Sequence, residues 1–108
     1  MMQTLNLAIK NRMTLYECYM PFVRNGGLFI PTDAELTLGE AVCISLDFMQ
    51  EPEPFRLPGK VVWITPQGAQ GDRTAGVGIG FDDGESMRRK IENCLAGAVA
   101  SERHTFTL

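Results

Sequence analysis

Alternation of apolar and polar side chains is the pattern that most limits how this chain can fold. In residues 41–48, which read AVCISLDF, every second residue is large and apolar: Val42, Ile44, Leu46 and Phe48. Successive side chains of a β-strand point to opposite faces of a sheet. A period of two over this segment therefore predicts a strand with one buried face.

The same alternation recurs in other segments, which are separated by glycines, prolines and polar loops. Leu5, Leu7 and Ile9 share one side of a short segment near the start of the chain. Later segments read GKVVWIT (residues 59–65) and TAGVGIGF (residues 74–81). We predict a mainly-β fold of about six strands joined by short loops, an antiparallel six-stranded β-barrel whose closure hides both sheet edges.

Glycines alternate with apolar residues inside the last of these segments. One face is bare and the other apolar, with Gly76, Gly78 and Gly80 set against Val77, Ile79 and Phe81. A glycine-rich cradle for a dinucleotide requires a helix that begins at the glycines, so this interpretation is disfavoured. A strand face without side chains instead indicates the close approach of another element, or a sharp bend of a barrel strand.

One amphipathic helix is predicted after the strands. Its apolar stripe recurs at helical spacing: Met87, Ile91, Cys94, Leu95 and Ala98. Asp82, Asp83 and Ser86 offer capping oxygens and favourable charge at its start, and Gly97 is suited to end it. The stripe must be buried, and the barrel is the surface that can cover it.

Residues within this helix and after it allow two further predictions. The basic triplet at residues 88–90 is interpreted as a solvated helix face rather than a phosphate-binding patch. The folded domain, strands and helix together, is placed at residues 1–98, and residues 99–108 are expected to form an exposed tail because they show little periodicity. Phe106 is an apolar side chain in that tail, and we expect it to dock on a partner.

Composition and charge exclude several classes of function. With 108 residues, the chain is long enough for one domain with a modest core. Its net charge of −3 disfavours binding to nucleic acid through the phosphates. No apolar run approaches the ~20 residues that a membrane helix needs, and the first residues do not read as a signal peptide. We expect a cytoplasmic protein that is not inserted in a membrane.

Residue types suited to catalysis or metal binding are scarce. Cys18, Cys43 and Cys94 are widely spaced and fit neither a disulfide framework nor a zinc site. The single histidine, His104, lies in the tail. No carboxylates cluster at metal-binding spacing, so we expect no catalytic residues, no metal and no cofactor. The chain is interpreted as a monomeric binding module rather than an enzyme.

The order of the segments carries a family resemblance. Along the chain come a G-G-L-F-I run, an L-G-E segment, a G-x-V-x-W strand, a G-V-G-I-G-F strand and an amphipathic helix. This set resembles the PilZ domain family over nearly the whole chain. The stretches LYECYMPFVRNGGLFIPT, PQGAQGDRTAGVGIGF and SERHTFTL look like the stand-alone PilZ proteins of type IV pilus systems.

Many PilZ domains are receptors for cyclic di-GMP, and the resemblance implies where the ligand-binding residues would stand. The family pattern is R-x-x-x-R before the barrel and D/N-x-S-x-x-G within it, because arginines supply forked donors for phosphate and guanine. Here Arg12 is followed four residues later by Tyr16. With the final glycine placed at Gly27, Phe22 takes the Asp/Asn position and Arg24 the Ser position. We therefore expect no binding of cyclic di-GMP; a receptor that uses a non-standard site is the alternative.

The resemblance implies a cytoplasmic adaptor for type IV pilus biogenesis and twitching motility. The proteins that the chain resembles are linked to FimX, a regulator with an EAL-type domain, and to the pilus assembly ATPase PilB. We expect a FimX-like regulator and a PilB-type ATPase as partners, and no nucleic acid.

The segment from Leu15 to Leu28 is where we expect a partner to bind. Interpreted as a strand, it is apolar on one side (Tyr16, Cys18, Met20, Phe22) and carries one charge on the other (Leu15, Glu17, Tyr19, Pro21, Val23). Both faces cannot lie in the core of so small a barrel. Either the helix or the N-terminal segment covers the outer face, or that face is an exposed interaction patch. The predicted partner contacts are Tyr16, Tyr19, Met20, Phe22 and Phe106.

Overall fold

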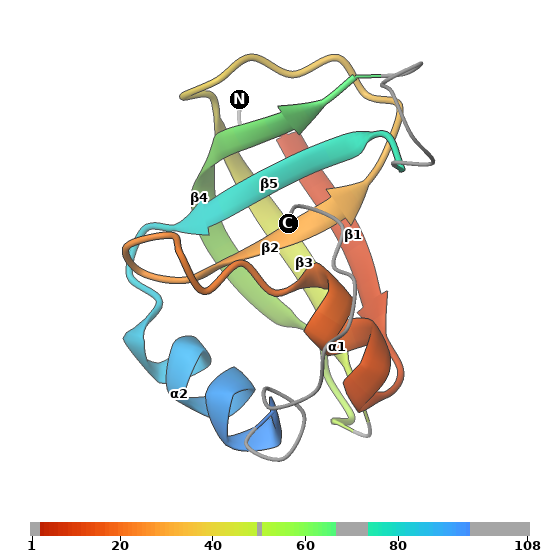
Figure 1. Cartoon of the computed structure of the whole chain (residues 1–108), viewed down its shortest axis with the longest axis vertical. Helices are drawn as coiled ribbons and strands as arrows, with labels where there is room; N and C mark the ends of the chain where they lie inside the picture. The colour runs from red at the N-terminus through yellow and green to blue at the C-terminus, as the bar shows by residue number, and fades with distance from the viewer. Residues whose placement is uncertain (1–2, 50, 67–73, 96–108) are drawn as a thin grey trace.

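A computed structural model of the chain describes residues 3–49, 51–66 and 74–95. Within them, the elements follow one another as β1 (Gln3–Ile9), α1 (Arg12–Cys18), β2 (Gly27–Pro31), β3 (Ala41–Phe48), β4 (Phe55–Thr65), β5 (Gly76–Phe81) and α2 (Glu85–Leu95). Figure 1 shows both helices at the same end of the sheet. The fold is mainly β, as the alternation predicted.

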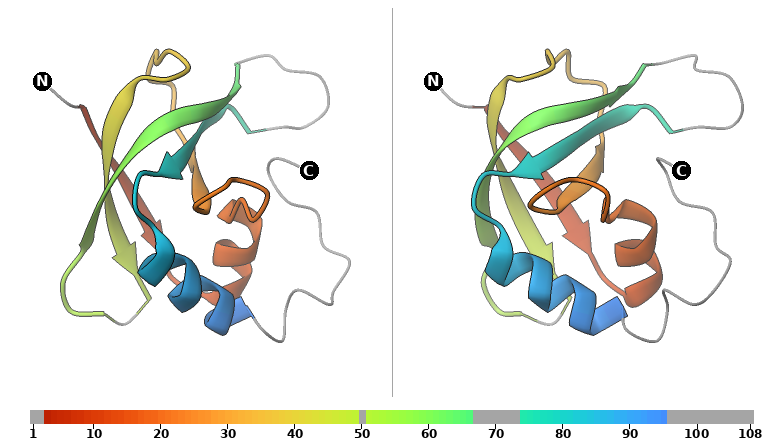
Figure 2. Two further views of the ribbon diagram at one scale, coloured as in Figure 1. Left: turned by 90° about the vertical axis from the view of Figure 1, so that its left-hand side faces the viewer. Right: turned by 60° about the vertical axis from the view of Figure 1, so that its left-hand side comes forward.

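The strands form one curled, mixed sheet in the order β1-β3-β4-β5-β2. β1 runs parallel to β3, and the other neighbours are antiparallel. Figure 2 shows the sheet bent into a half-barrel with β1 and β2 at its edges. The prediction of a closed barrel of six antiparallel strands is therefore wrong for the described residues, where the sheet has five strands and one parallel pair.

Alternation in β3 predicted the buried face correctly. Val42, Ile44 and Leu46 are 0% exposed and Phe48 is 2% exposed, whereas Asp47 on the other face is exposed. Their side chains belong to one core cluster that also includes residues from both helices. Burial of this apolar surface is the main term that stabilises the fold.

The C-terminal helix also matches its prediction as far as it is described. α2 buries Met87, Ile91 and Leu95, three members of the predicted stripe, in the core. Glu85 places a negative charge in the first turn, where it interacts favourably with the helix dipole. The end of the predicted stripe at Ala98 and the tail at residues 99–108 lie outside the described residues.

The segment that we interpreted as a strand before the glycines instead starts in a helix, α1, and continues as a loop, so the expectation of a single helix is wrong too. α1 begins after Asn11, whose Oδ1 accepts a hydrogen bond from the backbone N–H of Thr14 at 2.8 Å. Leu15 and Cys18 are three residues apart and both are buried. A strand would have spread its apolar residues over two faces, whereas one helical turn places these two on the same face.

Candidate functional site

The bare face of β5 is the feature around which the candidate site is built. Gly78 pairs with Phe29 of β2 on one side and with Trp63 of β4 on the other. A Cβ atom added at Gly78 would lie 2.6 Å from Sδ of Met20 and 2.8 Å from Cβ of Trp63. At Gly80, the added atom would lie 3.1 Å from a methyl group of Val23. The glycines therefore allow another element to approach closely, which confirms one of the two uses predicted for this face.

A β-bulge in β4 turns Trp63 onto this face. Val61 pairs with Ile79, but the next pair is Trp63 with Gly78, so Val62 is the additional residue on β4. Because side chains alternate along a strand, simple alternation from Val61 would have directed Trp63 into the core. The extra residue reverses that direction, which is a common use of bulges.

Trp63 is then fixed within its own strand. Its indole Nε1–H donates a hydrogen bond of 2.9 Å to Oγ1 of Thr65, two residues along β4. Thr65 is 5% exposed, and the bond satisfies its hydroxyl oxygen as an acceptor. A tryptophan with its N–H bound in this way presents the remainder of its ring as a rigid apolar surface.

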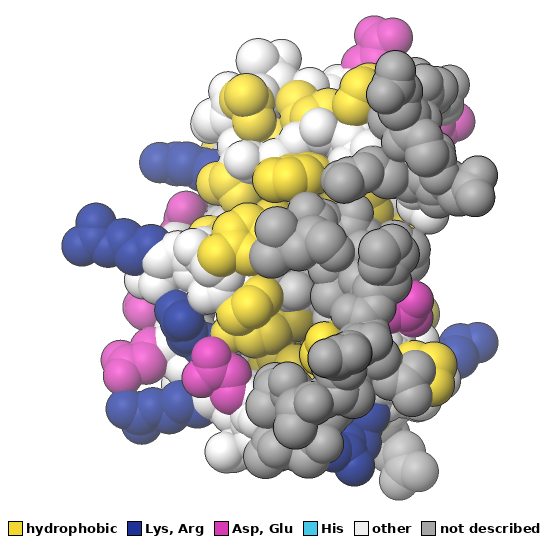
Figure 3. Space-filling model, viewed as in Figure 1, with side chains coloured by type: hydrophobic (Ala, Val, Ile, Leu, Met, Phe, Trp, Pro, Cys, Tyr) yellow, Lys and Arg dark blue, Asp and Glu magenta, His cyan; other side chains and the backbone are white. Residues whose placement is uncertain are grey.

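Phe22 lies against this indole. The two ring centroids are 6.2 Å apart, and the ring planes are inclined at 59°. Phe22 is 49% exposed and Val62 is 44% exposed, which is unusual for large apolar side chains. We call Phe22, Val62 and Trp63 the aromatic surface. Figure 3 shows hydrophobic side chains gathered over β5 and β2 on the face of the molecule seen in Figure 1.

The loop of residues 19–26, which connects α1 to β2 and carries Phe22, is tied to α2 by hydrogen bonds of Arg88 and of Tyr19. Arg88 donates hydrogen bonds to the carbonyl oxygen of Arg24 at 2.7 Å and to that of Pro21 at 3.3 Å. Its Nε also donates to Oε2 of Glu92 at 3.2 Å. The same carboxylate oxygen accepts a hydrogen bond of 2.9 Å from the hydroxyl of Tyr19.

This network corrects the interpretation of residues 88–90 as a solvated helix face. Only Arg89 fits that description, since it pairs with Glu85 and both side chains are 75% exposed. Lys90 donates to Oε1 of Glu51 at 2.7 Å and lies over the ring of Phe55, 5.3 Å from its centroid. Local residue patterns carry no signal for the contacts of Arg88 with the loop and of Lys90 with Glu51, because these partners lie far away along the chain.

The structure separates the five predicted partner contacts. Tyr19 is 5% exposed and Met20 is 0% exposed, so both lie beneath the surface. Their burial follows from the helical course of the preceding segment and from the glycines of β5. Tyr16 is partly buried on α1, Phe22 is exposed, and Phe106 lies outside the described residues. The interpretation of two strand faces is therefore wrong, while Phe22 remains available to a partner.

Trp63 and Arg88 are the residues that sequence reasoning missed. Trp63 is the only tryptophan of the chain, which was a usable signal because tryptophan is enriched at binding surfaces. The bulge that turns it onto the bare face of β5 left no signal in the alternation of GKVVWIT. For Arg88, nothing distinguished it from its neighbour Arg89.

Burial raises the pKa of two groups beside the loop. The pKa of Tyr19 rises from its ordinary value of 10.0 to about 12, first because burial disfavours the phenolate and then because Glu92 accepts its hydrogen bond and repels the negative charge. Burial likewise raises the pKa of the Cys18 thiol from 9.0 to about 12, with a smaller contribution from Glu17. Cys18 is therefore an unreactive thiol at neutral pH.

We predict that alkaline pH narrows the stability difference between the parent chain and Tyr19→Phe. At about pH 8 the parent should be more stable by about 1 kcal/mol, because the variant lacks the hydrogen bond to Glu92. Above pH 10 the unfolded tyrosine loses its proton while the folded one keeps it up to about pH 12, so this contribution is lost as the pH rises. Urea unfolding at about pH 8 and about pH 11 measures the difference. A difference that is the same at both pH values would contradict the prediction.

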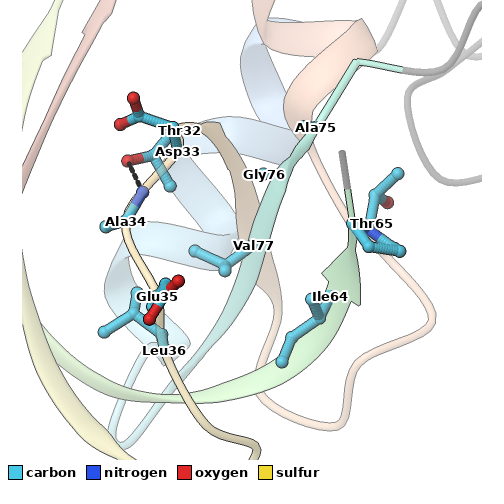
Figure 4. Close-up of a pocket in the computed structure, with 11 residues that line it drawn as sticks. Thr32, Asp33, Ala34, Glu35, Leu36, Ile64, Thr65, Ala75, Gly76 and Val77 are labelled. Carbon is cyan, nitrogen blue, oxygen red and sulfur yellow. Dashed lines mark hydrogen bonds between the residues drawn. The ribbon is translucent and has the colours of Figure 1, made fainter. Parts of the chain in front are cut away.

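A separate pocket of about 380 Å³ opens beside the end of β4, and Figure 4 shows the residues that line it. Its apolar part includes Leu36, Ile64 and Val77, and two carboxylates, Asp33 and Glu35, also line it. None of the described residues that line it is cationic. Negative charge at this position would repel the phosphates of a cyclic dinucleotide.

The part of the chain that the structure describes contains no group of histidine, cysteine, aspartate and glutamate side chains that could hold a metal ion. No described helix is both long enough and apolar enough to cross a bilayer.

Comparison with known proteins identifies the family. The family model of the PilZ domain matches residues 3–97, which is most of the chain. The chain belongs to the PilZ domain family. Domains of this family bind cyclic di-GMP or act as related adaptors, and they are typically not enzymes. A search of curated proteins returned no match.

With the family known, the two nucleotide motifs can be located in the fold. Arg12 and Tyr16, at the positions of the first motif, lie on α1. Phe22 and Arg24, which the sequence resemblance aligns with the Asp/Asn and Ser positions of the second motif, lie in the loop of residues 19–26, with Phe22 packed on Trp63. The carbonyl oxygen of Arg24 accepts a hydrogen bond from Arg88. Phe22, which the resemblance aligns with a polar position of PilZ receptors, is thus one half of an aromatic pair in this structure.

Proposed function

We propose that this PilZ domain is a non-enzymatic cytoplasmic adaptor for type IV pilus biogenesis and twitching motility. It binds a FimX-like EAL-domain regulator and a PilB-type assembly ATPase, and it does not itself bind cyclic di-GMP. The observation that carries the proposal is the contact between Phe22 and Trp63. Phe22 places an apolar ring at the position that we align with a nucleotide-binding residue, and this ring remains exposed while it packs against Trp63.

Loss of nucleotide binding is supported by the chemistry of the remaining residues. Guanine and phosphate recognition requires forked or paired polar groups at defined positions. The second arginine of the first motif is replaced by Tyr16, and a phenylalanine cannot accept or donate the hydrogen bonds of Asp or Asn. The pocket beside β4 carries Asp33 and Glu35, whose charge is unsuited to a phosphate ligand.

Protein binding is supported by the composition and rigidity of the aromatic surface. Aromatic side chains that are exposed and held in place are typical of residues that contribute most of the binding energy at interfaces. Phe22 is held by its loop and Trp63 by Thr65, so little side-chain freedom would be lost when a partner covers them. The link to pilus proteins rests on the sequence resemblance of the segments around these residues.

We predict that the purified chain does not bind cyclic di-GMP. Titration calorimetry should show no binding heat at micromolar concentrations of protein and nucleotide. A receptor PilZ domain with both motifs intact is the positive control. A dissociation constant in the micromolar range or tighter would contradict the prediction and would favour a receptor with a non-standard site.

The adaptor function is tested by capture from the cytoplasm of the native host, with and without added cyclic di-GMP. We expect the tagged chain to recover a PilB-type ATPase or an EAL-domain regulator, and purified proteins to reproduce the binding. Recovery of neither, together with no direct binding of the purified proteins, would contradict the proposed function.

A further inference from the structure

The aromatic surface depends on the position of a loop that has little structure of its own. Residues 19–26 connect the end of α1 to β2, and their internal backbone hydrogen bonds include Val23 N–H to Met20 O at 3.3 Å and Gly26 N–H to Val23 O at 2.8 Å. The backbone of Gly26 has a positive φ of 81°, a conformation that glycine adopts without strain. Such a turn needs attachments from outside to hold one position.

Arg88 supplies two of these attachments, one on each side of Phe22. Its Nη2 binds the carbonyl of Pro21, directly before Phe22, and its Nη1 binds the carbonyl of Arg24, two residues after it. A guanidinium presents its donors in a fixed planar fork, so the two carbonyls are held relative to each other as well as to α2. The hydrogen bond from Arg88 to Glu92 directs the fork toward the loop.

Contacts of neighbouring residues also define the path of the loop. Asn25, the residue after Arg24, donates its side-chain N–H to the backbone carbonyl of Asp82 at 3.2 Å. Met20 and Val23 lie on the bare glycines of β5, before and after Phe22. Pro21 and Arg24 are exposed, so their carbonyl contacts with Arg88 are accessible to competition by water. To compete with water, the donor group must fit both carbonyls at once. The planar fork of a guanidinium can do so, whereas the ammonium group of a lysine lacks this geometry.

We propose that Arg88 is the positioning residue of the aromatic surface: it fixes the backbone on both sides of Phe22 and so holds that ring against Trp63. Its value for partner binding rests on the function proposed above, but its effect on the loop can be measured in the free protein. Helix α2 thereby contributes to the surface through Arg88 although its own apolar stripe is buried in the core.

The test compares Arg88→Ala with Arg88→Lys and with Arg89→Ala. Arg89 is the matched control, since it lies on the same helix and pairs with Glu85 at the exposed surface. Two readouts report on the loop alone: hydrogen exchange at the amides of Val23 and Gly26, and the fluorescence of Trp63, the only tryptophan. The Phe22→Ala variant is the reference for the fluorescence of Trp63 without its aromatic neighbour.

We expect Arg88→Ala to accelerate exchange at the two loop amides by about tenfold and to shift Trp63 emission toward that of Phe22→Ala. Exchange in β3 should stay at the parent rate, Arg88→Lys should be intermediate, and Arg89→Ala should match the parent. If Arg88→Ala does not fold, Arg88→Lys carries the test with the same readouts. Unchanged loop exchange and emission, or an equal increase of exchange in β3, would overturn the proposal.

Partner binding separates this inference from the proposed function. Loosening of the loop with weaker capture of the partner supports both. Loosening without any change in capture leaves Arg88 as the positioning residue and shows that the aromatic surface is not the interface. Weaker capture with an unchanged loop would mean that Arg88 contacts the partner itself, and it would overturn the positioning role.

Discussion

Phe22→Ala is expected to weaken binding to the pilus ATPase or the EAL-domain regulator by about 30-fold, which corresponds to about 2 kcal/mol. Phe22 provides the exposed half of the aromatic pair, and removal of its ring would leave Trp63 without the neighbour that completes the surface. Because the side chain is already 49% exposed, the cost to folding should be small, within about 1 kcal/mol.

Met13→Ala is the matched control for this experiment. Met13 is 50% exposed and lies on α1, outside the aromatic surface, so its truncation removes a comparable exposed apolar side chain. Affinity is measured by titration calorimetry, and folding by circular dichroism and thermal unfolding. If Phe22→Ala and Met13→Ala bind the partner equally well, Phe22 is not part of the interface.

The second large effect is expected at Gly78, where Ala should lower the free energy of unfolding by about 2 kcal/mol. The new Cβ would lie 2.8 Å from Cβ of Trp63, an atom fixed directly to the backbone of β4, and within 2.7 Å of the terminal carbon of Met20. Met20 can move its flexible end, but the indole cannot move without straining the strand. The variant should therefore also alter Trp63 fluorescence.

Gly80→Ala provides a graded comparison on the same face of the same strand. Its new Cβ would lie 3.1 Å from methyl groups of Val23 and Val62, which small shifts of the loop and of the bulge can accommodate. We expect a loss of less than about 1 kcal/mol in urea unfolding. Equal losses for the two variants would show that the approach of Trp63 to Gly78 is not the limiting contact.

The residues of this chain determine a large part of the fold because their periodicity acts locally. The alternation of β3 identifies its buried face, since a strand offers only two faces to choose from. The stripe of Met87, Ile91 and Leu95 identifies the buried face of α2 for the corresponding reason at helical spacing. The bare face of β5 predicted the close approach of another element, but the residue pattern did not identify that element.

Local pattern failed where two periods fitted the same residues. Over the seven residues of α1, the apolar positions fit an amphipathic helix about as well as a strand, and only the capping oxygen of Asn11 favoured the helix. The strand interpretation then added a sixth strand and exposed Tyr19 and Met20 incorrectly. The parallel pairing of β1 with β3 was also beyond reach, because nothing within residues 3–9 encodes the identity of a partner strand.

By itself, the sequence determined the mainly-β character of the fold and the buried faces of β3 and α2, and it placed an apolar residue, Phe22, before the glycines of residues 26 and 27. Only the tertiary structure decided that this residue belongs to a surface. The bulge at Val62 directs Trp63 outward, and Arg88 binds the carbonyl of Arg24, 64 residues earlier in the chain. Contacts over such separations depend on how the whole sheet curls, and a local pattern of residues carries no information about that curvature.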